Sequence, residues 1–193
     1  MIEFEEFPKM ARLSRECIIS EKIDGTNAQV CITEEGEFLT GSRNRWIIPG
    51  DDNAGFAKWA YANKEELMIL GEGWHRGEWW GQGIQRGYGL KEKRFSLFNT
   101  IRWCLHGNTP QSTNSSGGLQ EILPKCVGLV PILYRGVFTT EAVDEALSNL
   151  EKSGSLASPE FMKPEGIVVY HMAGAVGFKR TIEKDDIPKT LQK

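Results

Sequence analysis

The chain has 193 residues, of which 40% are hydrophobic and 25% are charged, and its formal net charge is −3. A chain of this length buries roughly 70% of the surface that its unfolded form exposes, so it can fold without a metal or a disulfide. The ordinary composition excludes disorder of the whole chain, and the acidic balance excludes a protein whose entire surface binds polyanions. A local cationic cleft for a polyanion stays open, because Arg43 and Arg45 cluster along the chain, as do Arg86, Lys91, Lys93 and Arg94.

The first third of the chain is predicted to form short strands joined by tight turns. Cys17–Ser20 is a β-prone run, residues 24–26 have turn chemistry, and Gln29–Ile32 resumes the strand. A hairpin turn at Glu34–Glu37 then leads into the strand Phe38–Thr40.

Two helices are predicted from apolar residues that recur on one face. The first lies within residues 51–68 and has Asp52 or Asn53 as its candidate cap; its apolar positions are Phe56, Trp59, Ala60 and Leu67. The second begins near Thr140 and ends around Gly154; its apolar positions are Val143, Leu147 and Leu150.

The remaining elements are predicted as strands and one long loop. Residues 94–103 are expected to form one buried strand, and residues 106–118, which are polar and rich in Ser and Gly, a surface loop. Ile167–Tyr170 and Val176–Lys179 are two further short strands. Strands outnumber helices and pair mostly as hairpins, so the predicted class is α+β with largely antiparallel sheets. No linker or repeat divides residues 1–193, which predicts a single domain.

The cysteines and the N-terminus predict a cytoplasmic protein without a membrane segment. The four cysteines (Cys17, Cys31, Cys104, Cys126) are widely separated and have neither zinc-site spacing nor a disulfide framework. No apolar run has the length of a membrane span, and the acidic N-terminus does not resemble a signal peptide.

The most informative motif is Glu21-Lys22-Ile23-Asp24-Gly25-Thr26-Asn27. A Lys-x-Asp-Gly tetrapeptide alone matches many surface turns, in which the lysine is solvated beside a hairpin. Here Lys22 ends an apolar strand, and the turn returns the chain at once into another strand, which would direct the ammonium group into a cleft. Further features follow in a fixed order along the chain: Arg43, Glu78 in Arg-Gly-Glu-Trp, Phe98, Glu165 before an apolar strand, and Lys179.

This ordered series resembles the motifs of the covalent nucleotidyltransferases, which comprise ATP-dependent DNA ligases, RNA ligases and mRNA capping enzymes. It covers about four fifths of the chain, from Glu21 to Lys179. The Thr26-Asn27 extension is most similar to the nick-sealing RNA ligases. The resemblance implies an adenylation domain of the ligase type, in which two antiparallel sheets with flanking helices enclose an ATP cleft.

The activity that the resemblance implies is ATP-dependent strand joining with Mg²⁺ or Mn²⁺. Lys22 would take AMP from ATP, the AMP would pass to a 5′-phosphate, and a 3′-hydroxyl would displace it. The expected partner is nucleic acid with such ends, RNA in preference to DNA. Covalent catalysis divides one difficult transfer into two easier ones, and nearby cations would favour the neutral amine that attacks.

The same resemblance implies a role for each motif residue. Lys22, Lys179 and Arg43 would be catalytic, and Glu165 would bind the metal through its hard oxygen donors. The residues expected to bind ATP are Glu21, Asp24, Gly25, Asn27, Glu78, Phe98 and Arg180. Among them, Glu78 would accept hydrogen bonds from the ribose, Phe98 would stack on adenine and Asn27 would orient a phosphate. Taken alone, a phenylalanine such as Phe98 in an apolar strand is more often a core residue, Glu165 could equally be a solvated strand end, and Asn27 could be part of a turn.

Two departures from the family pattern leave alternatives open. The last motif usually has two lysines separated by one residue, whereas here Arg180 follows Lys179 directly. The chain also ends soon after this motif, so we expect no C-terminal nucleic-acid-binding domain, and a partner protein could supply that grip. A capping-type guanylyltransferase that uses GTP is one alternative. A module that binds a nucleotide or a nucleic-acid end without sealing it is the other.

Overall fold

The computed structural model describes residues 2–106, 109–112, 123–183 and 185. The chain forms two compact units, of which the first comprises Met1–Lys22, Ile132–Gly154 and Met162–Lys193, and the second Ile23–Pro131 and Ser155–Phe161. The chain passes from the first unit to the second directly after Lys22. Whether both units fold as one domain, as the sequence suggests, stays a prediction.

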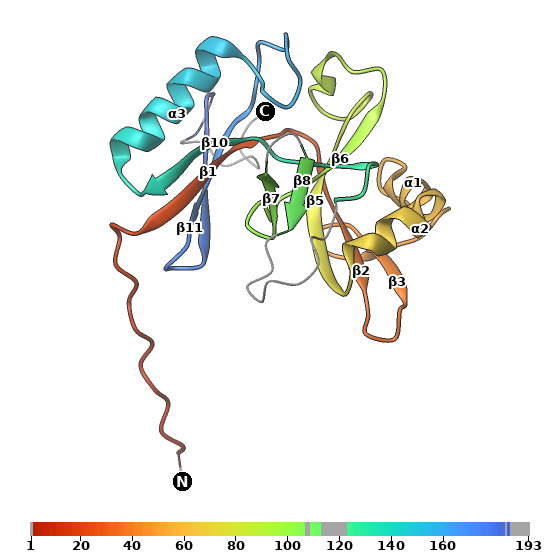
Figure 1. Ribbon diagram of the computed structural model, residues 1–193, viewed down its shortest axis with the longest axis horizontal. Coiled ribbons are helices and arrows are strands. Elements are labelled where there is room, and N and C mark those ends of the chain that lie inside the picture. The colour runs from red at the N-terminus through yellow and green to blue at the C-terminus, as the bar shows by residue number, and fades with distance from the viewer. Residues whose placement is uncertain (1, 107–108, 113–122, 184, 186–193) are drawn as a thin grey trace. The chain divides into compact units, whose positions relative to one another are not determined.

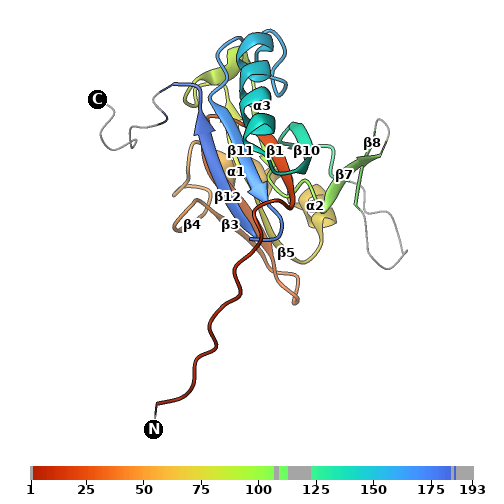
Figure 2. The same ribbon diagram turned by 90° about the vertical axis from the view of Figure 1, so that its left-hand side faces the viewer.

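The first unit is a four-stranded antiparallel sheet with one helix on one face (Figure 2). The strand order is β10 (Ile132–Val137), β1 (Glu16–Lys22), β11 (Gly166–His171) and β12 (Val176–Thr181). Buried side chains from β1 and β11 pack against the helix α3 (Thr140–Ser153); they are Cys17, Ile19, Ile167 and Val169 against Ala146 and Leu150. Because successive side chains on a strand alternate, Ile18, Ser20 and Lys22 lie on the opposite face.

The helix α3 has the ends that its sequence predicts. Thr139 is its N-cap, and the Thr139 hydroxyl accepts a hydrogen bond from the Ala142 N–H at 3.1 Å. Gly154 is the C-cap, and its N–H donates to the Leu150 carbonyl at 2.9 Å. The predicted helix from Thr140 to about Gly154 is therefore confirmed.

The second unit is built on a six-stranded sheet, whose strands β2, β3 and β5 are labelled in Figure 1. Its strand order is β4 (Trp46–Ile47), β3 (Phe38–Gly41), β2 (Thr26–Ile32), β5 (Gly73–Gly81), β6 (Lys93–Leu97) and β9 (Val127–Leu129). All neighbours are antiparallel except β6 and β9, which are parallel. The prediction of largely antiparallel sheets is confirmed, and β6 with β9 is the exception, because residues 98–126 give the chain enough length for a crossover. The α+β class with two main sheets is confirmed.

Short helices cover the core face of this second sheet. They are α1 (Phe56–Ala62), α2 (Lys64–Leu67) and the 3₁₀ turn η1 (Met68–Leu70), which together replace the one helix predicted within residues 51–68. Asp52 satisfies the first turn of α1 from outside the helix, since its carboxylate accepts from the N–H groups of Ala57 and Lys58 at 2.7 and 2.9 Å. The N-cap position itself is Gly55, so the candidate cap Asp52 acts from three residues further back.

The predicted strand over residues 94–103 is two strands instead. β6 ends at Leu97, and Asn99 then turns the chain by accepting a hydrogen bond from the Arg102 N–H at 3.0 Å. β7 (Trp103–His106) begins after this turn and pairs with β8 (Thr109–Ser112) in a separate two-stranded sheet. The predicted loop 106–118 is therefore wrong where these strands lie, and its remainder, residues 107–108 and 113–118, falls outside the described residues.

The adjacent tryptophans of β5 point into two different apolar clusters. Trp79 packs with Phe56 and Phe95 on the face covered by α1, and Trp80 packs with Tyr88 on the other face. Each is only 2% exposed. Both are thus core residues, as alternation along a strand requires for at least one of them.

Cys17, Cys31 and Cys126 are free thiols. Along the part of the chain that the structure describes, none of the helices combines the length and apolar character needed to cross a bilayer. The cytoplasmic location suggested by the sequence stays a prediction.

Cys126 is expected to react slowly with alkylating reagents although it is only half-buried. Burial, together with the negative charge of Glu66, raises the pKa of its thiol to about 11. Since only the thiolate reacts, iodoacetamide labelling of Cys126 near neutral pH should be slow and should rise as the pH approaches that value. Glu66→Gln should accelerate labelling several-fold, because the carboxylate opposes ionisation, and Glu65→Gln is the matched control. Labelling with the pH profile of an ordinary thiol, measured by peptide mass spectrometry, would contradict this expectation.

Candidate functional site

The first unit brings Lys22 and Glu165 together although they are far apart in the sequence. β1 ends at Lys22, which lies opposite Gly166 in the pairing of β1 with β11, and Glu165 immediately precedes that glycine. The Lys22 Nζ forms an ion pair with Oε2 of Glu165. The two side chains are 19% and 5% exposed, so a cation and an anion are held together largely out of water. Removing one partner of such a buried pair costs roughly 3–5 kcal/mol.

Gly166 is needed at this position for a steric reason. Its φ is +157°, and a Cβ on it would lie 2.2 Å from the backbone oxygen of Arg180 in β12. Only glycine permits β12 to approach so closely. The Glu-Gly dipeptide therefore combines a buried carboxylate with the backbone that places it beside Lys22.

Lys179 and Arg180 lie on opposite faces of the first sheet. Lys179 is opposite Val168, which is itself opposite Ser20, so its side chain is on the same face as that of Lys22. Arg180 is on the face covered by α3, where its guanidinium pairs with Asp144. This placement does not favour the predicted contact of Arg180 with ATP, which stays an untested prediction.

Glu21 is 1% exposed and belongs to the α3 side of the sheet, because it follows Ile19 at an interval of two. A contact of its side chain with ATP stays a prediction. The backbone of Glu21 directly precedes that of Lys22 on β1.

The turn after Lys22 is held by residues of the second unit. Glu78, on β5, accepts hydrogen bonds from the Gly25 N–H through Oε1 and from the Asn27 side-chain amide through Oε2, both at 3.1 Å. The Glu78 residue is 7% exposed, so its carboxylate supports the turn from beneath. A carboxylate offers about four acceptor positions, and these two bonds are compatible with further ones to a ligand.

Gly25 permits the turn to lie directly on β5. A Cβ at this position would be 2.5 Å from the Trp79 carbonyl oxygen and 2.8 Å from Trp80 Cβ. Real Cβ atoms do not approach backbone so closely, and the tight contact explains the glycine of the motif.

Asp24 is fixed by two residues to which sequence reasoning gave no such role. Its carboxylate accepts from Nε of Arg86 at 3.1 Å, and its backbone N–H donates to the Tyr88 hydroxyl at 2.8 Å. The sequence placed Arg86 in a cationic cluster for nucleic acid and did not single out Tyr88. The spacing of 62 residues between Arg86 and Asp24 carries no local signal of their contact.

The other predicted cations are partly paired as well. Arg45 forms two hydrogen bonds with Asp51 at 2.7 and 2.9 Å, and Arg94 pairs with Glu92 at 2.7 Å. Arg43, in the turn between β3 and β4, is exposed and makes no hydrogen bond or ion pair with residues that the structure describes.

Phe98 follows β6 directly and is 42% exposed. Its N–H donates to the Arg76 carbonyl at 2.9 Å, which continues the sheet by one residue. The alternative that Phe98 is a core residue is therefore wrong, and its ring is accessible to a ligand. Stacking on adenine stays a prediction.

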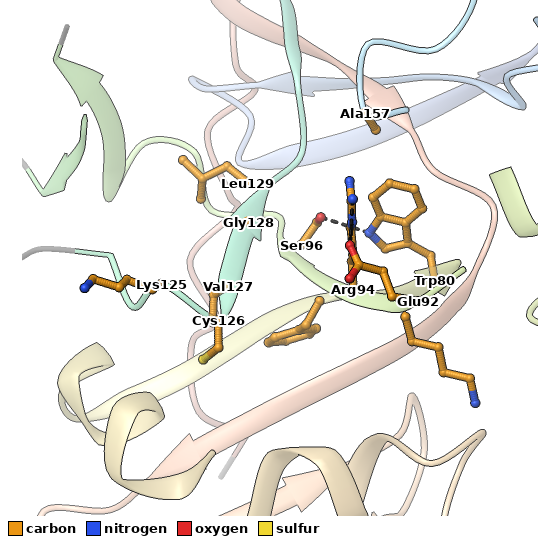
Figure 3. A pocket seen from close by; sticks show the side chains of 12 residues that line it. Trp80, Glu92, Arg94, Ser96, Lys125, Cys126, Val127, Gly128, Leu129 and Ala157 are labelled. Atoms are coloured by element: carbon orange, nitrogen blue, oxygen red, sulfur yellow. Dashed lines mark hydrogen bonds and ion pairs between the residues drawn. The ribbon is translucent and has the colours of Figure 1, made fainter. Parts of the chain in front are cut away.

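A hollow of about 410 Å³ lies at the edge of the second sheet, beside β6 and β9 (Figure 3). Its lining includes Trp80, whose indole N–H donates to the Ser96 hydroxyl at 3.0 Å, and the Arg94–Glu92 pair. None of the predicted site residues lines it. The hollow is therefore separate from the site that the motif residues form.

Comparison with known proteins identifies the family. The model of the RNA ligase family matches residues 15–184, which contain every predicted site residue. Comparison with curated protein sequences gives no match.

Three solved structures with a similar fold are of the Naegleria gruberi RNA ligase. A lysine variant without ligand has a TM-score of 0.58 and 23% identity over 87% of this chain and 50% of that one. A second lysine variant, with AMP and manganese, has 0.57 and 23% over 88% and 50%. An arginine variant with ATP and manganese has 0.58 and 22% over 89% and 51%.

This likeness shows the fold, and the present chain spans about half the length of those structures. The family match has the greater weight because it extends from before β1 to beyond β12. The chain belongs to the RNA ligase family.

Proposed function

We propose that the chain acts as an ATP-dependent RNA ligase that becomes covalently adenylylated on Lys22. The main support is the Lys22–Glu165 pair, in which an amine at a strand end is held beside a buried carboxylate. The turn that follows it is fixed through Gly25 and Asn27 by Glu78. A positioned amine beside a carboxylate suits phosphoryl chemistry, in which orientation and charge neutralisation contribute most of the catalysis.

In the first proposed step, the Lys22 ammonium gives one proton to water, and the neutral Nζ then forms a bond to the α-phosphorus of ATP and loses a second proton. The bond from that phosphorus to the β-phosphate bridging oxygen breaks, and pyrophosphate leaves with the electron pair. In the second step an oxygen of an RNA 5′-phosphate displaces the lysine, and in the third a 3′-hydroxyl displaces AMP and joins the strand. The solved Naegleria enzyme has been captured with ATP and with AMP, each together with manganese, and we extend that chemistry to this chain.

Glu165 is a suitable ligand for the divalent metal that this reaction would use. Glu165 supplies hard oxygen donors, and no group of three or more metal-binding side chains occurs within the described residues. Mg²⁺ is usually held by one or two carboxylates together with substrate phosphates, which is what a single carboxylate beside Lys22 would allow. When bound, such an ion would neutralise charge on the phosphates.

The other residues are assigned by their surroundings. We propose that Glu78 and Asn27, which are already joined to each other, bind the sugar and a phosphate, and that the exposed Phe98 stacks on the base. Lys179 and Arg43, exposed cations, would stabilise the charge that develops on the phosphates.

Incubation with ATP and Mn²⁺, followed by intact mass measurement, tests the proposal. We expect the mass of one AMP to be added, in an acid-labile bond, and ATP to label better than GTP. Better labelling by GTP would support the capping-type alternative. Nucleotide binding without any adduct would support the non-sealing module. Sealing of a nicked RNA duplex, measured on a gel, separates adenylylation from complete ligation.

Substitution of the two buried carboxylates should separate metal binding from sugar binding. Glu165→Gln should abolish or strongly reduce labelling and move the midpoint of its metal dependence to higher concentration, since a carboxylate donor is lost. Glu78→Gln should also reduce labelling, but its metal midpoint should stay at the wild-type value. Glu151→Gln, an exposed change on α3, serves as the control. A shifted midpoint for Glu78→Gln alone would mean that these roles are reversed.

A further inference from the structure

An exposed aromatic pair lies on the sheet face that also carries Glu78. Trp46 of β4 and Trp74 of β5 are stacked, with ring centroids 5.3 Å apart and planes at 23°. They are 50% and 52% exposed. Single exposed apolar residues are common, but two tryptophans stacked on each other in water form a contiguous apolar surface, which is typical of a binding site.

Arg76 adds a cation to this surface. Its guanidinium lies 5.5 Å from the Trp74 ring centroid, and its Nε–H donates to the Gln29 side chain at 3.3 Å. Within the described residues this is the only hydrogen bond of the Arg76 side chain, so its remaining N–H groups face solvent. An arginine against an exposed aromatic ring can contact a phosphate while the ring stacks on a base.

The pair is continuous with the residues proposed to bind the nucleotide. Along β5, Trp74, Arg76 and Glu78 alternate on one face. In the pairing with β2 they lie opposite Cys31, Gln29 and Asn27. The aromatic pair is therefore four residues from the Asn27–Glu78 row, about 13 Å, or roughly the length of four stacked nucleotides.

The charge around this face indicates where a polyanion would end. The turn between β2 and β3 begins two residues beyond Cys31 and carries Glu34, Glu35 and Glu37, all exposed. These carboxylates would repel phosphates beyond the tryptophans. Along this face, the cation Arg76 is therefore followed by the aromatic pair and then by the acidic turn.

We propose that Trp46, Trp74 and Arg76 form a stacking platform for bases of the RNA strand, four residues along the second sheet from the Asn27–Glu78 row. The proposal rests on the proposed function in its choice of RNA. Bases and phosphates match the two kinds of group present, since the rings can stack on bases and Arg76 can contact a phosphate. Stacking does not depend on base identity, which suits an enzyme that joins strands of any sequence.

The test is the binding of a short oligoadenylate to the purified chain, measured by fluorescence anisotropy at low salt. Trp74→Ala should raise the Kd about tenfold, and Trp74→Phe should keep most of the affinity because a ring remains. Ile69→Ala, another exposed apolar residue of the same unit, is the control and should leave the Kd unchanged. An abasic oligomer of equal length should bind wild type and Trp74→Ala alike, since it offers no base to stack.

AMP labelling of the same variants makes the two proposals separable. Normal labelling with a tenfold loss of RNA affinity in Trp74→Ala supports both. An absence of labelling in wild type would remove the proposed function, while a base-dependent effect of Trp74 would still support the platform. The platform is overturned if Trp74→Ala binds oligoadenylate like wild type, if wild type fails to bind it, or if the variant only converts a dimer to a monomer in sedimentation.

Discussion

Lys22→Arg is expected to abolish the AMP adduct while the chain stays folded. Arginine keeps a positive charge beside Glu165, so the buried carboxylate retains a cationic partner. The guanidinium cannot lose its proton in proteins, however, and therefore cannot attack phosphorus. Labelling should fall below detection, a loss on the order of 10⁴-fold or more if the residue is the nucleophile.

The comparison with Lys22→Ala isolates the chemical effect from the structural one. Alanine also removes the nucleophile, but it takes the cationic partner from Glu165 and should lower the free energy of unfolding by roughly 3–5 kcal/mol. Lys152→Arg, an exposed change in α3, is the control for labelling. Intact mass and thermal unfolding are measured on all three variants. An AMP adduct that persists in Lys22→Arg would refute the assignment of the nucleophile.

Gly25→Ala should slow labelling strongly although it removes no functional group. The new Cβ would lie 2.5 Å from the Trp79 carbonyl oxygen, which belongs to a central strand and cannot yield. The turn must move instead, and its hydrogen bond to Glu78 is then lost. Overpacking of this kind costs about 1–3 kcal/mol, and a displacement of about 1 Å near the reacting groups is expected to slow labelling about 100-fold.

Gly128→Ala provides the matched control in the same unit. A Cβ there would meet the Ser96 hydroxyl at 3.4 Å, an ordinary contact distance. Its labelling rate should therefore equal that of wild type. The steric explanation fails if Gly25→Ala labels at the normal rate, or if both glycine variants lose activity equally.

Strand positions near the motif were predictable from local pattern, whereas contacts between distant residues were not. β1, β2 and α3 follow from apolar runs and turn residues, and Thr139 and Gly154 fix the ends of the helix. The proximity of Lys22 and Glu165 carries no periodic signal, because 143 residues separate them, and it was expected only from the family resemblance.

Two arginines show more clearly that charge alone does not predict which groups a side chain contacts. Charge alone assigns Arg86 and Arg180 to anionic ligands, yet each pairs with an aspartate of its own unit. Alternation along β12 could have placed Arg180 on the opposite face from Lys179, since neighbouring residues of a strand cannot share a face. The break after Leu97 also had a local signal, because Asn99 is a turn-forming residue inside an apolar run.

The hydrogen bonds from Gly25 and Asn27 to Glu78 have a consequence for the order of folding. The segment that contains the proposed nucleophile is synthesised early, but its turn is supported only after β5 has paired with β2. Glu165, the charge partner of Lys22, is synthesised later still, directly before the strand that follows α3. A growing chain thus contains Lys22 long before the residues that position its side chain have been synthesised. Covalent labelling by ATP would consequently report a late stage of folding. It would begin only after each of the two sheets has formed and fixed its part of the motif.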